Sequence, residues 1–179
     1  MTLSPWEDTK PMNKSKISVG ILSLSAAAFI SLVSSEGYVE RAMVPTEGDR
    51  PTVGFGSTFH EDGRPVRMGE STTPVRALIV AQAHLSKEED LFRKSLTGAS
   101  LSQVEYDLYM DFVYQYGITN WNGSSMRRHI LASNYSAACD ALLMWKRAGG
   151  YDCSTPGNKR CWGVWERQLA RHKQCIGAQ

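Results

Sequence analysis

The sequence predicts an α+β fold in which a small β element precedes a larger helical lobe. Residues 42–68 are rich in Gly, Pro and Thr and contain short β-prone pieces, whereas residues 72–179 follow a helical pattern with capping motifs. Before both lies an uncharged apolar stretch, Ile17–Ser35, which predicts an N-terminal apolar helix. We therefore divide the 179 residues into an N-terminal segment, 1–35, and one folded domain, 36–179.

The apolar stretch Ile17–Ser35 is close in length to the roughly 20 residues that span a bilayer. Six serines, one glycine and three alanines lower its hydrophobicity, so membrane insertion would be marginal. Lys14 and Lys16 would stay on the cytoplasmic side. Three interpretations stay open: a permanent anchor, a signal peptide cleaved near Ala26–Ala28, and a segment that enters the membrane for export and later leaves it. We favour the third, for a reason that depends on Glu36.

The β element is expected to contain three short strands. They are residues 41–44, 52–55 and 64–66. Thr46–Asp49 and Glu61–Gly63 separate them and are strong turn signals.

The helical lobe is marked by local start signals. Thr73 followed by Pro74 opens a long helix toward Phe92. Ser102 and Glu105 form a capping box at the start of the next helix. The later helices are expected after Gly123–Ser125, after a cap at Asn134, and over residues 163–176.

Four cysteines lie in the last quarter of the chain: Cys139, Cys153, Cys161 and Cys175. None forms a Cys-x-x-Cys pair, and His172 shares no zinc-ligand spacing with them, which favours two disulfides over a metal site. Three pairings are possible, and we favour Cys153 with Cys161 and Cys139 with Cys175. Disulfides would require an oxidising compartment such as the periplasm; the alternative is buried free thiols in a cytosolic protein.

Composition excludes few functions. The formal charge of +2 suits an anionic polymer as substrate, but it suits many neutral substrates equally. No glycine-rich phosphate loop, repeat or heptad occurs, and we expect no cofactor, no metal, no nucleic acid partner and a monomer. Translation starts at Met1 or at Met12, which begins a more usual basic export sequence.

Catalytic chemistry is indicated at Glu36, a carboxylic acid that ends the apolar segment and precedes a hairpin with further acidic residues. Glycosidic cleavage needs one protonated carboxyl to donate to the leaving oxygen and a second group on the other sugar face. A Glu at the end of an apolar helix is partly desolvated, which raises its pKa. A lone Glu in such a place is usually only a solvated helix end, but the hairpin that follows favours catalysis.

The window from Glu36 to Gly56 resembles the phage lysozymes of glycoside hydrolase family 24. Their signature is Glu, eight residues, Asp or Cys, five residues and Thr, followed by Gly-x-Gly. Glu36-Gly-Tyr matches the start and Thr52-Val-Gly-Phe-Gly the end, but Pro45 stands at the second carboxylate position and Thr52 comes sixteen residues after Glu36 rather than fifteen. The nearest carboxylates are Glu47 and Asp49, of which we favour Asp49, three residues before Thr52.

The resemblance implies a lysozyme-like fold and an inverting hydrolase that cuts the β-1,4 bond between N-acetylmuramic acid and N-acetylglucosamine in peptidoglycan. Glu36 would be the general acid, Asp49 the second catalytic group, and Thr52 would help to hold the attacking water. Because the resemblance continues through residues 103–117, 124–127 and 145–150, it extends to Cys175.

The resemblance also implies a sugar-binding cleft. Its expected lining is Gln115, Tyr116, Ser124 and Ser125. Each has an ordinary alternative, since Tyr116 suits the core and Ser124 can cap a helix. Ser57 stands where some relatives have His, and we expect His60 to be a loop residue.

In the resembling family the catalytic Glu ends the first helix of the folded domain, and here only residues 17–35 can supply that helix. The chain therefore resembles signal-anchor-release endolysins. These are exported by the host secretion pathway, tethered transiently to the inner membrane, and then active in the periplasm for host cell lysis. Two other functions stay open: a lytic transglycosylase, and a non-catalytic, membrane-anchored wall-binding protein.

Overall fold

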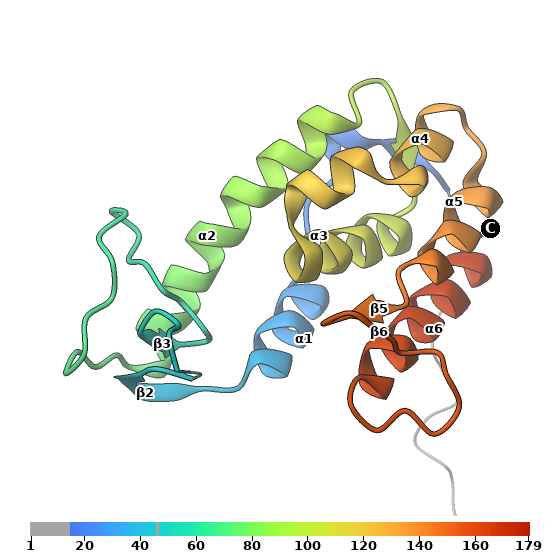
Figure 1. The fold of residues 1–179 in the computed structure, drawn as a ribbon. Coiled ribbons are helices and arrows are strands. Elements are labelled where there is room, and N and C mark those ends of the chain that lie inside the picture. Colours follow the sequence, from blue (N-terminus) through green and yellow to red (C-terminus); the bar gives the residue numbers. More distant parts are fainter. Residues whose placement is uncertain (1–14, 46) are drawn as a thin grey trace, which may run out of the picture. The chain divides into compact units, whose positions relative to one another are not determined.

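The computed structural model describes residues 15–45 and 47–179, so Met1, Met12 and Lys14 lie outside the described residues. The chain divides into two compact units that interleave along the sequence. The first unit runs through Leu22 and includes Leu96–Tyr109 and Gly123–Gln179, and the second contains Ser23–Ser95 and Met110–Asn122. Helix α3, Gln103–Gly123, contributes to both units and is interrupted at Gly117, which has a φ of 82° (Figure 1).

The second unit contains a β hairpin and a long helix. Its elements outside α3 are α1 (Ala26–Glu36), β2 (Val39–Met43), β3 (Thr52–Gly54) and α2 (Pro74–Ser95). Strands β2 and β3 pair antiparallel, with Val39 opposite Gly54 and Met43 opposite Thr52, as predicted for the first two strands.

The predicted third strand, residues 64–66, is wrong. Only an isolated bridge joins Pro65 to Phe59 there. The bonds His60 N–H to Arg64 O and Val66 N–H to Thr58 O lie on either side of that bridge. The chain turns again directly after Val66, where the Glu70 N–H donates to Arg67 O, so the ladder does not extend into a strand.

Helix α2 begins as predicted and supports the core of the second unit. The Thr73 hydroxyl accepts from the Arg76 N–H at 3.2 Å and caps the helix. Near the other end of α2, the fully buried ring of Phe92 packs 5.0 Å from that of Trp121. The indole N–H of Trp121 donates to Ser95 Oγ at 2.9 Å, so the buried indole has a polar partner.

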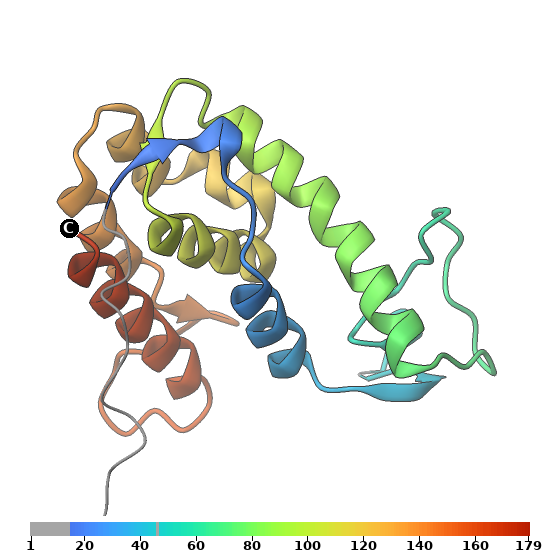
Figure 2. The ribbon, with the colours of Figure 1, turned by 180° about the vertical axis from the view of Figure 1, so that it is seen from behind.

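The predicted continuous helix over residues 17–35 is wrong in its first half. Residues 17–21 form a two-residue strand, β1 (Ile17–Ser18), and a 3-10 turn, η1 (Val19–Ile21). Strand β1 pairs antiparallel with β4, Ser100–Leu101 (Figure 2). Helix α1 starts only where Ser25 Oγ accepts from the Ala28 N–H at 3.1 Å, because this cap fixes the first helical turn. Within the described residues, no helix has both the length and the apolar character needed to cross a membrane.

The first unit holds the remaining elements. They are α4 (Ser125–Leu131), α5 (Tyr135–Ala141), the 3-10 turn η2 (Leu142–Met144), β5 (Arg147–Ala148), β6 (Tyr151–Asp152) and α6 (Trp162–Gly177). Helix α5 starts after Asn134, but the side chain of Asn134 makes no capping hydrogen bond, so that cap is wrong. The backbone N–H of Asn134 instead donates to His129 O, which continues the turn after α4.

Two disulfides cross-link the first unit in the predicted pairing. Cys139 on α5 bonds to Cys175 on α6, and Cys153 bonds to Cys161 across an eight-residue separation. The hydroxyl of Tyr109 lies 3.3 Å from Cys175 Sγ, and burial raises the pKa of Tyr109 well above its ordinary value. This disulfide therefore lies in the buried core of the unit.

The predicted capping box at Ser102 and Glu105 is present and has a third member that the sequence did not indicate. Glu105 Oε2 accepts from the Ser102 N–H at 2.8 Å, and the fully buried carboxylate also binds Lys16 Nζ at 2.6 Å from each oxygen. The Lys16 ammonium lies 4.0 Å from the centre of the Tyr135 ring, and Gln179 Nε2 donates to Glu105 Oε1 at 2.9 Å. The segment before β1 is thus fixed to the start of α3.

Candidate active site

Glu36 is the last residue of α1. The helix is anchored by Leu32 and Val33, which are 3% and 5% exposed, and it ends because Gly37 adopts a φ of 72°. Glu36 itself is exposed. The partial desolvation expected for its carboxyl is therefore wrong, because the chain turns away at Gly37 and leaves the end of α1 uncovered.

The turn between β2 and β3 carries both candidates for the second carboxylate. Glu47 and Asp49 are exposed, and neither forms an ion pair with another described residue. Thr52, the first residue of β3, donates from its hydroxyl to Met43 O at 3.4 Å. Both carboxylates are thus accessible to water, and the pairing of β2 with β3 fixes the position of Thr52.

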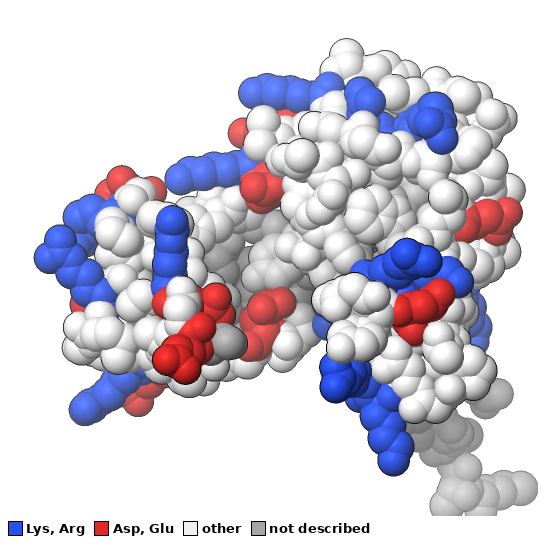
Figure 3. Space-filling view, viewed as in Figure 1, with Lys and Arg blue, Asp and Glu red and all other residues white. Residues whose placement is uncertain are grey.

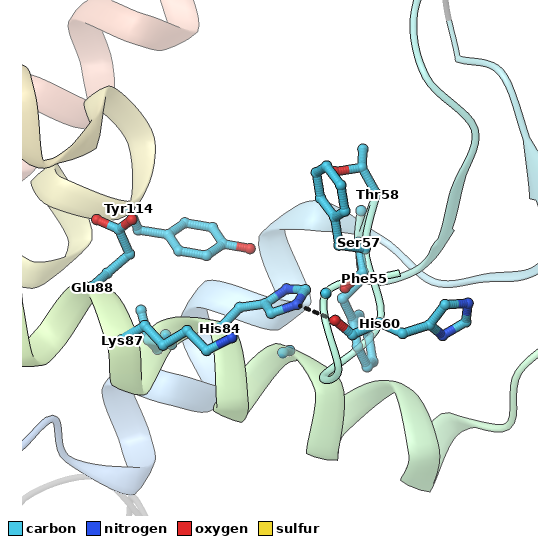
Figure 4. A pocket seen from close by; sticks show the side chains of 13 residues that line it. Phe55, Ser57, Thr58, His60, His84, Lys87, Glu88 and Tyr114 are labelled. Carbon is cyan, nitrogen blue, oxygen red and sulfur yellow. Dashed lines mark hydrogen bonds between the residues drawn. The ribbon is translucent and has the colours of Figure 1, made fainter. Parts of the chain in front are cut away.

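A pocket of about 430 Å³ opens in the second unit beside this hairpin. Its side chains come from the loop after β3, from α2 and from α3, and Figure 4 shows Tyr114 and His84 both pointing toward the loop. The labelled lining residues are Phe55, Ser57, Thr58, His60, His84, Lys87, Glu88 and Tyr114. Aromatic rings, hydroxyls, the imidazole of His84 and a carboxylate thus share one concave surface, the combination with which proteins bind polar organic ligands.

Histidine and carboxylate side chains organise the pocket. The imidazole of His84 donates to His60 O at 3.4 Å, and the His60 ring pairs with Glu70 at 2.9 Å. The hydrogen bond from His60 holds the pKa of Glu70 below its ordinary value. Glu88 Oε2 is buried and has no hydrogen-bond partner among the described residues. His60 is a loop residue, as expected, and it also fixes the wall of the pocket.

Glu36 lies at the rim of the pocket. A Cβ atom at position 56 would lie 3.7 Å from Glu36 Oε2, and Gly56 lines the pocket. Burial raises the pKa of Tyr114, and the negative charge of Glu36 raises it further. The carboxylate is therefore close to both Gly56 and the phenol of Tyr114.

The residues expected to line a sugar cleft behave differently from one another. Gln115 Oε1 is buried without a hydrogen-bond partner among the described residues. The centre of the Tyr116 ring lies 4.7 Å from that of Phe112, which fits the alternative that Tyr116 is a packing residue. Ser124 and Ser125 belong to the first unit. Ser124 Oγ caps α4 by accepting from the Arg127 N–H, and Ser125 Oγ donates to Met144 Sδ at 3.5 Å.

The pocket residues that were missed from the sequence include His84, Glu88 and Tyr114. Tyr114 had one usable signal, since it directly precedes Gln115 in the stretch that resembles the family. His84 and Glu88 had none, because four-residue spacing on a helix is ordinary and nothing local indicates a pocket.

Comparisons with known proteins agree with this fold. Residues 33–168 match the family described as phage lysozyme. The endolysin of Salmonella phage P22 is 31% identical over 129 residues, which cover 72% of this chain and 87% of that relative.

Solved structures of phage lysozymes and endolysins share this fold. The crystal structure of a P22 lysozyme mutant superposes with a TM-score of 0.69 at 27% identity, covering 87% of this chain and 99% of that one. The endolysin from Escherichia coli O157:H7 phage FAHEc1 has a TM-score of 0.71 at 23% identity, covering 88% of this chain and 95% of that one, and it supports the fold alone.

The lysozyme-like α+β fold and the family match define a glycoside hydrolase. The chain belongs to the phage lysozyme family. It is therefore a lysozyme, an enzyme that lyses peptidoglycan.

Proposed function

We propose that this lysozyme is an endolysin that hydrolyses the β-1,4 bond between N-acetylmuramic acid and N-acetylglucosamine, with Glu36 as general acid. The observation that supports this role is the position of Glu36 Oε2, beside Gly56 at the rim of the pocket. A carboxyl group at that point can reach the oxygen of a glycosidic bond bound in the pocket, and the aromatic and polar lining suits a sugar ring.

In the proposed mechanism Glu36 donates its proton to the leaving glycosidic oxygen while water attacks the anomeric carbon from the opposite face. Asp49 accepts a proton from that water, and Thr52 helps to hold it in line. This is a single displacement, so the product has the inverted configuration. The exposure of Asp49 and the fixed position of Thr52 on β3 support these two roles.

Replacing Glu36 by glutamine tests the general acid, because the amide keeps the shape of the side chain and cannot donate the same proton. Lysis of outer-membrane-permeabilised Gram-negative cells should fall about 100- to 10,000-fold. Glu40→Gln is the matched control, since Glu40 is an exposed carboxylate on neighbouring β2. Unchanged lysis by Glu36→Gln would refute the assignment.

The second carboxylate is tested by comparing Asp49→Ala with Glu47→Ala. Both side chains are exposed in the same turn, so both variants should keep the parent's thermal stability. Asp49→Ala should lose most of the activity and Glu47→Ala little of it. The reverse order would move the role to Glu47.

Two alternative functions give different products. A lytic transglycosylase needs only the acid and leaves an anhydro sugar, whereas hydrolysis leaves a hydrated reducing end, and mass spectrometry of the released muropeptides separates the two. A membrane-anchored wall-binding protein would release no sugar at all. The proximity of Glu36 to the pocket favours catalysis over that last function.

We further propose that residues 1–35 are a signal-anchor-release segment, whose residues 17–35 carry the chain through export and then become part of the enzyme. In support, Val19 and Leu22 are 1% and 5% exposed within the first unit. Glu36, which the proposed chemistry requires, ends the helix formed by the rest of the segment.

Membrane fractionation tests this proposal. The chain should partition with the inner membrane soon after synthesis and appear in the periplasm later. The N-terminal sequence of the periplasmic form is decisive, because an intact segment agrees with release and a new terminus near Ala28 means signal-peptide cleavage.

A further inference from the structure

A shallow groove of about 420 Å³ lies in the first unit on the loop that the Cys153–Cys161 disulfide closes. Its walls are Gly157, Asn158, Lys159 and Trp162. Trp162 is 38% exposed, although tryptophan is usually well buried. The proposed mechanism uses none of these residues.

The loop has a fixed shape before any ligand arrives. Asn158 Oδ1 accepts from the Arg160 N–H at 2.9 Å, and Asn158 Nδ2 donates to Asp152 O at 2.9 Å. With the disulfide, these bonds hold both ends of the loop. A surface that is already ordered loses little conformational entropy on binding.

The charge around the groove is positive. Lys159 and Arg160 are exposed, and the Arg160 guanidinium lies over the Tyr151 ring and donates to the Tyr151 hydroxyl. The nearby carboxylate of Asp152 is already bound by Lys146 at 3.0 Å and by Ser154 Oγ at 2.6 Å. No described carboxylate forms an ion pair with either loop cation. Figure 3 shows Lys and Arg side chains on the surface around β5, β6 and the loop that follows β6.

We propose that this groove is a second binding site for the cell wall, where Trp162 packs against a sugar ring and Lys159 and Arg160 bind carboxylates of the peptide stems. The proposal rests on the proposed function and adds to it a wall contact outside the pocket. A flat aromatic surface in a groove of this volume fits a glycan. A lipid phosphate would be bound by the cations alone.

The test measures how much of the full chain pellets with purified Gram-negative sacculi, in the Glu36→Gln background so that the wall is not consumed. Two variants are compared with the parent: Trp162→Ala, and a double Gln variant that combines Lys159→Gln with Arg160→Gln. Each should weaken binding about threefold to tenfold, the range expected for an aromatic contact or for two screened charges. Added salt should weaken the parent and leave the double Gln variant nearly unchanged.

The matched control is Arg128→Gln with Lys173→Gln, which removes the same charge from exposed positions of the same unit. It should bind sacculi within twofold of the parent. Because Trp162 starts α6, circular dichroism must show that its variant is folded, and the double Gln variant tests the groove independently.

Two outcomes would overturn the proposal. One is equal sacculus binding by the parent and both groove variants; the other is groove-dependent binding to phosphatidylglycerol vesicles but not to sacculi. Reducing sugar released by the chain with Glu36 intact is measured in parallel. Its absence would refute the proposed function and leave the pelleting comparison valid.

Discussion

Replacing Lys16 by methionine isolates the ion pair at the start of α3. Methionine keeps much of the length and the apolar stem of lysine but removes the ammonium that lies 2.6 Å from both oxygens of Glu105. The Lys16 side chain is 23% exposed and that of Glu105 is 0% exposed, so the substitution leaves a negative charge in the interior without its counter-ion.

The loss of stability depends on the hydrogen bonds that Glu105 keeps in the variant. Breaking a buried pair by removing one partner costs about 3–5 kcal/mol. The Ser102 N–H, the Ser102 hydroxyl and Gln179 Nε2 still donate to the carboxylate, so the lower end applies and the free energy of unfolding should fall by about 3 kcal/mol. For a chain of this size that corresponds to a decrease in Tm of about 6–12 °C.

Urea denaturation followed by circular dichroism measures the loss. Lys173→Met, on the exposed face of α6, is the control and should stay within about 0.5 kcal/mol of the parent. Adding Glu105→Gln to Lys16→Met removes the buried, uncompensated negative charge and should recover at least half of the lost stability. A Lys16→Met variant as stable as the parent would refute the ion pair, and so would a double variant no more stable than Lys16→Met.

Three further predictions concern the pocket, the disulfide loop and the hairpin. Glu36→Gln should lower the pKa of Tyr114, measured by NMR titration of the labelled ring; burial, the larger cause, should still keep it above its ordinary value. The Ser154 hydroxyl, more than any other contact, lowers the pKa of Asp152 to about 2. The stability that Asp152 contributes is therefore fully present above pH 3.8 and is lost as the pH falls through about 2, which acid titration of loop amide signals would follow. Gly54→Ala should lower the free energy of unfolding by about 2–4 kcal/mol in urea titrations, because its φ is +67° and the new Cβ would lie 2.7 Å from a side chain of α2.

The sequence was sufficient where structure is decided locally. The capped start of α2 at Thr73 and Pro74 and the capping box at Ser102 were predictable, because each depends on residues within one helical turn. The same reasoning could not connect Glu105 to Lys16, which lies 89 residues away. Only the tertiary fold brings those two residues together.

The errors have the same origin. The composition of residues 17–35 indicated one helix, but pairing of β1 with β4 and the cap at Ser25 divide the segment. Tyr114 and His84 were missed because the pocket combines three segments that are remote in sequence. Local patterns could therefore not indicate which side chains surround Glu36, whose role as the acid stays a prediction.

Both disulfides lie in the first unit, so only that unit has cross-links that a reducing compartment can remove. The Cys139–Cys175 bond closes a 36-residue separation, which corresponds to about 4 kcal/mol of stabilisation through the unfolded chain. A chain still in a reducing compartment lacks that contribution in the first unit. The second unit, which holds Glu36 and the pocket, contains no cysteine. Oxidation therefore adds cross-links to the first unit alone, and Glu36, the proposed general acid, lies in the unit that has none.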